Sequence, residues 1–101
     1  MNKITTIGEL AIIKHPDKIP VIVHYENSKS DNFLVHNDNT IGNFAVIIRQ
    51  KIKLNYSEIL LISVNGTILD ANELISILYS KYKNPKDNCI HFDISRQNTQ
   101  F

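Results

Sequence analysis

Apolar positions along this chain of 101 residues repeat with two different periods, and each period predicts a different kind of element. Residues 41–54 carry apolar side chains at intervals of three and four, which places them on one face of a helix. Residues 90–94 alternate instead, with three apolar side chains separated by two polar ones, as in a strand with one buried face. The pattern therefore predicts both an amphipathic helix and a half-buried strand.

Further strands are predicted where β-branched and other apolar residues run together between turn residues, over 19–25, 33–35 and 59–64. The dipeptide Asn65-Gly66 is typical of a tight hairpin, and residues 67–69 return from it. The polar residues 37–40 are expected to cap the helix that follows them.

Two short helices are predicted from reciprocal capping, in which two side chains three residues apart satisfy each other's free N–H groups. Thr6 and Glu9 have this spacing at the start of residues 6–14. Asp70 and Glu73 have it at the start of residues 70–82.

The predicted order is strand, strand, helix, strand, short helix, strand. A hairpin, one helix packed on a mixed sheet and a returning final strand make up the ubiquitin-like β-grasp, an α+β fold. We expect a mixed four-stranded sheet, a central helix and a short N-terminal helix in one domain. Residues 1–17 would form a helical extension, 18–94 the β-grasp core and 95–101 a polar, mobile tail. The central helix is expected to pack Phe44, Ile48 and Ile52 against Ile22, Ile62, Ile90 and Phe92.

Charge and composition narrow the class of protein. Eleven basic residues against ten acidic ones give a net charge of +1, which provides no electrostatic reason to expect nucleic-acid binding. The single cysteine excludes an internal disulfide and favours a reducing compartment. No unbroken apolar run approaches the ~20 residues needed to cross a bilayer. We expect a soluble, cytoplasmic monomer.

Catalytic and metal-binding patterns are not found in the sequence. The histidines stand apart from one another, without the spacing of zinc ligands on one element, at His15, His24, His36 and His91. Cys89 opens a predicted strand and is expected to be a small buried hydrophobic residue. The glycines occur singly, so no phosphate-binding loop is predicted. We therefore expect a non-enzymatic binding protein with no metal and no cofactor.

Two stretches resemble the autophagy ubiquitin-like modifiers, the GABARAP and microtubule-associated light-chain family. KHPDKIPVIV, residues 14–23, is similar to the family's entry to its first strand. FLVHNDNTIGNFAVIIRQKIKL, residues 33–54, is similar to its second strand and central helix. Weaker matches lie at residues 63–65 and 78–79, and the likeness covers about residues 6 to 99.

The resemblance implies two adjoining apolar pockets beside the second strand, where a partner's aromatic-x-x-aliphatic segment adds as an extra strand. The first pocket would be lined by Pro20, Ile22 and Leu34, with Ala11 and Cys89 at positions where relatives carry larger groups. The second would use Phe33, Val35, Phe44 and Ile47, and Lys18 and Lys51 match basic positions that attract acidic residues beside the motif. Ile47 also lies off the helix stripe, which leaves it without a core role. An alternative interpretation is that some of these residues belong only to the hydrophobic core, namely Pro20, Ile22, Leu34 and Phe44.

Departures from the family pattern keep other interpretations open. Ser30 and Asn32 occupy two positions that are basic in the family, so the positive rim is thinner here. The activated modifiers end in a glycine that is joined to phosphatidylethanolamine, and the last residue here is Phe101. The resemblance implies the autophagy conjugation enzymes as partners. It also implies autophagosomal or other intracellular membranes, but only if a glycine follows Phe101.

Two alternatives accompany this interpretation. The first is the autophagy-twelve type of modifier, some members of which lack the glycine and act non-covalently in the lipid-conjugation ligase. The second is an unrelated ubiquitin-like domain that serves only as an interaction module.

Overall fold

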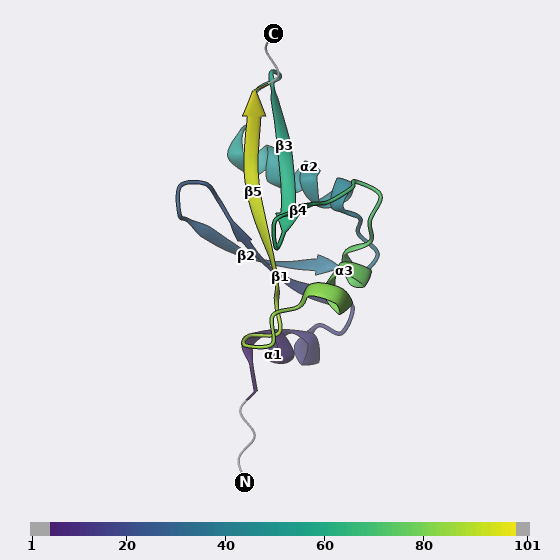
Figure 1. Cartoon of the computed structure of the whole chain (residues 1–101). Coiled ribbons are helices and arrows are strands. Elements are labelled where there is room, and N and C mark those ends of the chain that lie inside the picture. Colours follow the sequence, from purple (N-terminus) through teal and green to yellow (C-terminus); the bar gives the residue numbers. More distant parts are fainter. Residues whose placement is uncertain (1–4, 99–101) are drawn as a thin grey trace.

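The computed structural model describes residues 5–98, which form one five-stranded sheet with three helices packed around it (Figure 1). The strand order is β2-β1-β5-β3-β4, with β1 and β5 parallel and the other neighbours antiparallel. The strands are β1 (Lys18–His24), β2 (Ser30–His36), β3 (Glu58–Val64), β4 (Thr67–Ile68) and β5 (Ile90–Asn98), and the helices are α1 (Ile7–Lys14), α2 (Ile41–Ile52) and α3 (Ile75–Tyr82). This confirms the mixed sheet and central helix of the ubiquitin-like fold.

The sheet has five strands where four were predicted, because the residues that return from the hairpin pair with β3. Val64 lies opposite Thr67 and Ser63 opposite Ile68, which makes a short fifth strand. Asn65 and Gly66 both have positive φ, at 49° and 81°, as the predicted type of tight turn requires.

The hydrophobic core lies between α2, α3 and one face of the sheet. Phe44 and Ile48 of α2 are 0% exposed, and the ring of Phe44 packs 5.8 Å from that of Phe92. Ile62 and Ile90 belong to the same buried cluster, as predicted. The prediction for Ile22 was wrong, because strand alternation turns it away from α2. The members of β1 that enter the core are Ile19, Val21 and Val23.

Capping explains where the first two helices begin. The Thr6 side chain accepts from Glu9 N at 3.2 Å while Glu9 Oε1 accepts from Thr6 N at 3.2 Å, so the predicted reciprocal cap of α1 is confirmed. Thr40 and Asn43 form the equivalent cap at α2, with N···O distances of 3.0 and 3.1 Å. Each pair satisfies backbone N–H groups that a helix start leaves without partners.

The third helix starts later than predicted, at Ile75 and not at residue 70. Glu73 does accept from Asp70 N at 2.7 Å, but the Asp70 side chain accepts from Asn72 N at 3.3 Å, so the pair closes a turn. The carbonyl of Glu73 accepts from Ile41 N at 2.9 Å. The backbone of this segment is therefore used to anchor the start of α2.

The last strand is longer than predicted, and the assignment of residues 95–98 to a mobile tail was wrong. Ser95 lies opposite Leu61 in β3, and the pairing continues to Asn98 opposite Glu58. Backbone pairing with β3 therefore extends the strand through residues whose side chains are polar. Phe101 lies outside the described residues.

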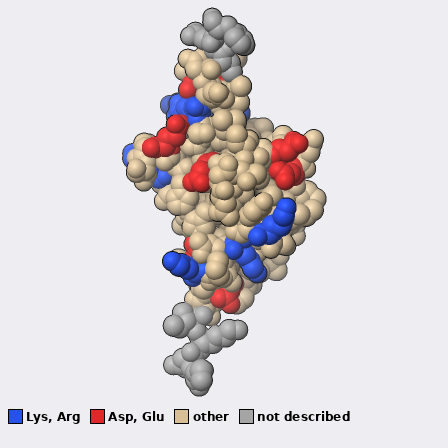
Figure 2. Space-filling model, viewed as in Figure 1, with Lys and Arg blue, Asp and Glu red and all other residues tan. Residues whose placement is uncertain are grey.

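The surface carries both signs of charge. On the face shown in Figure 2, lysine and arginine side chains are interspersed with acidic ones, without a large patch of a single sign. Within residues 5–98, no helix has the length and apolar character that crossing a membrane requires.

Candidate binding site along the β2 edge

The second strand, β2, forms one end of the sheet and pairs with β1 alone among the described strands. A terminal strand leaves one row of its backbone N–H and C=O groups outside the sheet's own ladder. These groups are available to an added strand, the arrangement that the resemblance implies.

The residues predicted for the first pocket lie together on the face of the sheet that turns away from α2. Pro20 lies directly opposite Leu34 in the β1–β2 register, and Ile22 is two residues farther along β1 on the same face. Leu34 is 44% exposed, Ile22 is half-buried and Pro20 is buried. Leu34 is therefore the accessible member of this group. Cys89, which directly precedes β5, is 2% exposed and adds no accessible surface to this group.

The residues predicted for the second pocket lie on the opposite face, between β2 and α2. Phe33 packs edge-on against Phe44 with ring centroids 5.4 Å apart, and Ile47 is 42% exposed on the adjoining helix. Phe44 is fully buried and Val35 is 4% exposed, so neither presents accessible surface, and their contact with a partner stays a prediction. Phe44 instead supports Phe33 from beneath, and Ile47 is the large apolar side chain that remains accessible.

The two cations predicted for the rim have different surroundings. Lys18 begins β1 opposite His36, at the end of β2. Lys51 lies at the other end of β2, with its Nζ 3.0 Å from Asp31 Oδ2 and 5.0 Å from the centroid of the Phe33 ring. Hydrogen bonds from Lys51 and then from Tyr25 hold the pKa of the Asp31 carboxyl below its usual range. Lys51 is thus already paired within the chain.

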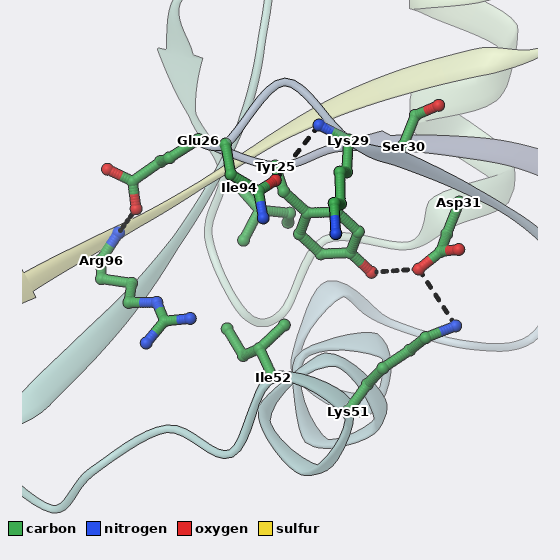
Figure 3. Close-up of a pocket in the computed structure, with 10 residues that line it drawn as sticks. Tyr25, Glu26, Lys29, Ser30, Asp31, Lys51, Ile52, Ile94 and Arg96 are labelled. Atoms are coloured by element: carbon green, nitrogen blue, oxygen red, sulfur yellow. Dashed lines mark hydrogen bonds and ion pairs between the residues drawn. The ribbon is translucent and has the colours of Figure 1, made fainter.

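A hollow of about 340 Å³ opens beside this ion pair, between the β1–β2 turn, the last turn of α2 and β5 (Figure 3). The Tyr25 hydroxyl donates to Asp31 Oδ2 at 2.9 Å. Burial, together with this hydrogen bond and the charge of Asp31, raises the pKa of Tyr25 to about 12. The hollow is lined by Tyr25, Glu26, Asn27, Lys29, Ser30, Asp31, Lys51, Ile52, Ile94 and Arg96, so it includes neither Leu34 nor Ile47.

Sequence reasoning missed a chain of hydrogen bonds that joins His24, His91 and Asp87. His24 Nε2 lies 2.8 Å from His91 Nδ1, and His91 Nε2 lies 2.7 Å from Asp87 Oδ2. Spacing along the sequence carried no signal for it, because His24 and His91 are 67 residues apart and meet only through the parallel pairing of β1 and β5. Among the described residues, no group of three or more potential ligands is arranged to hold a metal ion.

The prediction that Cys89 is a buried hydrophobic residue is confirmed. It is 2% exposed, and burial together with the nearby charge of Asp87 raises the pKa of its thiol to about 11. A thiol that stays protonated at neutral pH is a poor nucleophile.

Comparisons with known proteins agree with the fold. The family described as "Autophagy protein Atg8 ubiquitin like" matches residues 5–100. Autophagy-related protein 8e of Arabidopsis thaliana is 36% identical over 92 residues, covering 85% of this chain and 75% of the plant protein. Autophagy-related protein 8 of Kluyveromyces lactis is 34% identical over 99 residues, covering 91% and 78%. The crystal structure of Trypanosoma brucei ATG8 superposes with a TM-score of 0.79 at 25% identity, covering 93% of this chain and 85% of that one.

These matches support the first of the resemblances over the autophagy-twelve type and over an unrelated ubiquitin-like domain. Proteins of the matching family are autophagy-related ubiquitin-like modifiers and adaptors, and they are not enzymes. The chain belongs to the Atg8 family of ubiquitin-like autophagy proteins.

Proposed function

We propose that the chain is an adaptor that binds aromatic-x-x-aliphatic segments of partner proteins by adding them as a strand along β2. One observation carries the proposal: the accessible apolar side chains Leu34 and Ile47 flank the β2 edge on opposite faces of the sheet. Successive side chains of a strand alternate between faces, so two side chains three residues apart point to opposite faces. The spacing of the motif therefore suits a pocket on each side of this edge.

The expected affinity follows from the size of the contact. Backbone groups along the seven residues of β2 would supply hydrogen bonds, and burial of two partner side chains would supply the apolar contribution. A short peptide must also be ordered on binding, which costs part of that gain. We expect micromolar binding, a free energy of about −8 kcal/mol or weaker.

The decisive experiment compares two neighbouring substitutions on α2 in calorimetric titrations with a motif peptide. Ile47 and Lys51 are four residues apart and share the flank that faces β2, whereas Val46, which is 55% exposed, points to another flank. Ile47→Ser should abolish binding and Val46→Ser should leave it unchanged. Both residues are substantially exposed, so each change should alter stability by only about 0.5 kcal/mol. Full affinity in the Ile47→Ser protein would place the binding site elsewhere.

A second peptide tests the geometry directly. Shortening the motif to aromatic-x-aliphatic puts both side chains on the same face of the added strand. Because Leu34 and Ile47 lie on opposite faces, this peptide should bind at least about tenfold more weakly, a loss of roughly 1.4 kcal/mol. Equal binding of the two peptides would contradict strand addition between two pockets.

We also propose that conjugation to phosphatidylethanolamine by the autophagy conjugation enzymes depends on a glycine directly after Phe101. Glycine reaches backbone angles closed to other residues and has no side chain to obstruct a narrow enzyme channel. The test mixes two proteins, one ending at Phe101 and one extended by glycine, with activating enzyme, conjugating enzyme, ATP and liposomes. Only the extended protein should form a lipid adduct. An adduct on the protein ending at Phe101 would refute the requirement, and a failure of both would favour non-covalent action.

A further inference from the structure

Lys51 is held by contacts within its own domain at the place where a partner's acidic residue would approach. Its Nζ lies 3.0 Å from Asp31 Oδ2, and the same oxygen accepts from the Tyr25 hydroxyl at 2.9 Å (Figure 3). The ammonium group also lies 5.0 Å from the centroid of the Phe33 ring, within the range of a cation–π contact. Asp31 and Phe33 therefore hold Lys51 directly, and Tyr25 holds Asp31.

We propose that Asp31 is a specificity-determining residue that competes with a partner's acidic side chains for Lys51, so that the β2 edge accepts motifs with neutral flanking residues as readily as acidic ones. This inference rests on the proposed binding of motifs along β2.

The charges around Lys51 support the competition. The side chains of Lys51 and Asp31 are 49% and 35% exposed, so the pair lies at the surface where a partner would meet it. A second carboxylate brought to Lys51 would be repelled by Asp31 at close range. The flanking residues of β2, Ser30 and Asn32, add no positive charge.

Of the other two cations of the hollow, Arg96 is also engaged within the chain. The Arg96 guanidinium lies 3.8 Å from Glu58 Oε1, and the backbone N–H of Arg96 donates to Glu26 at 3.0 Å. Lys29 lies in the hairpin turn, so the three cations of the hollow face the two acids Glu26 and Asp31.

The substitution Asp31→Asn separates the charge of this residue from its structural role. Asparagine keeps the volume of the side chain and an oxygen that accepts from the Tyr25 hydroxyl, and it removes the negative charge. The contact of Lys51 with the Phe33 ring does not involve the carboxylate, so it should persist in this variant. The matched control is Asp93→Asn, which makes the same charge change at an exposed position of β5.

The test titrates three proteins, the wild type, Asp31→Asn and Asp93→Asn, with two motif peptides. One peptide carries Asp and Glu immediately before the aromatic residue, and the other carries Ser and Asn there. Asp31→Asn should bind the acidic peptide roughly two- to fivefold more tightly than the wild type does, the range expected for one newly available surface cation. Its affinity for the neutral peptide should not change, and Asp93→Asn should match the wild type with both peptides. Adding Lys51→Met to Asp31→Asn should remove the gain, and salt should reduce it.

The outcomes distinguish this inference from the proposed function. An unchanged ratio of acidic to neutral affinities in Asp31→Asn, with both peptides bound, would overturn the role of Asp31 and leave strand addition intact. Equal weakening of both peptides would show a structural role for Asp31 and would also overturn the inference. If none of the three proteins bound either peptide, the proposed function and this inference would both be overturned.

Discussion

His24 and His91 are hydrogen-bonded to each other across the parallel strands β1 and β5, with their rings stacked at 5.1 Å and their facing nitrogens 2.8 Å apart. Such a bond needs one nitrogen that donates and one that accepts. A neutral His91 that donates from Nε2 to Asp87 accepts at Nδ1 from His24, so Asp87 fixes the tautomer of the pair. Asp87 precedes β5 and also accepts the Gly8 N–H of α1 at its backbone carbonyl.

Replacing Asp87 should therefore change stability in a pH-dependent way. Burial raises the pKa of this carboxyl, but hydrogen bonds from Cys89 N–H and the His91 ring outweigh it and hold the pKa below its usual range. Such a group stabilises the fold above its unfolded pKa of about 3.9 and loses this effect as the pH falls through the folded value. Asp87→Asn should lower the free energy of unfolding by roughly 1–3 kcal/mol at pH 7.

Urea denaturation of both proteins at pH 7, 5 and 3 provides the measurement. The difference between wild type and Asp87→Asn should persist at pH 5 and shrink below about pH 3.9, where the carboxyl takes up a proton in the unfolded chain before it does so in the folded one. A difference that stays constant over this range would show that the carboxylate charge contributes nothing to the fold.

Gly8 should be required for docking of α1 because the helix passes directly against the turn before β5. Its N–H donates to Asp87 O at 2.7 Å, and a Cβ at this position would overlap with the carbonyl of Asn88. Gly8→Ala should expose α1 to hydrogen exchange and destabilise the domain by about 2 kcal/mol. Gly42→Ala is the matched control for α1, since its tight Cβ contact, 3.2 Å from Ala71 O, lies at the start of α2 and does not touch α1. Equal protection of α1 in both variants would contradict the docking role.

Phe44 should contribute to stability rather than to binding. Its ring is fully buried between Phe33 and Phe92, so Phe44→Ala empties a closed site and should cost roughly 3–5 kcal/mol. Val46→Ala, at a position that is 55% exposed on the same helix, should change stability by only about 0.5 kcal/mol. Thermal and urea unfolding measure both, and an unchanged melting temperature for Phe44→Ala would show that the core lies elsewhere.

Tyr25 should titrate at unusually high pH. Burial is the main cause of its pKa of about 12, and the hydrogen bond to Asp31 and the charge of Asp31 add to it. Since the neutral phenol is favoured in the folded chain, its contribution to stability is complete below pH ~10 and is lost as the pH rises toward 12. Ultraviolet titration should show that Asp31→Asn lowers this pKa without returning it to the ordinary value, because burial remains. The Tyr25→Phe protein shows which part of the absorbance change belongs to Tyr25. If Tyr25 titrated at the same pH in Asp31→Asn as in the wild type, the result would contradict the hydrogen bond between Tyr25 and Asp31.

Local patterns in the sequence predicted the elements whose residues follow one period throughout. The α2 stripe that contains Phe44 and Ile48 was predicted correctly, since the helix repeat and the buried face coincide. The reciprocal pattern of Asp70 and Glu73 was misleading, because turns and helix starts use the same local hydrogen bonds. Tertiary pairing with α2 decided between them.

Contacts between distant segments are the part of the candidate site that could not be predicted from the sequence. The resemblance grouped Pro20 with Leu34 in one pocket, and β1–β2 pairing places the two residues opposite each other. Neither periodicity nor spacing along the sequence predicted the ion pair between Asp31 and Lys51 or the hydrogen bond between His24 and His91. Each of these contacts joins different elements of the fold. Strand register and helix rotation, which create these contacts, are properties of the folded chain.

The open side of β2 also has a consequence for the protein at high concentration. An edge that can accept a foreign strand is equally a template for β2 of another molecule, and such self-pairing is a route to aggregation. The polar residues Ser30, Asp31 and Asn32 act as gatekeepers here, because a charged or amide side chain discourages a continuous apolar ladder between identical strands. The same three residues that thin the positive rim of β2 are thus expected to limit its pairing with a second copy of the chain.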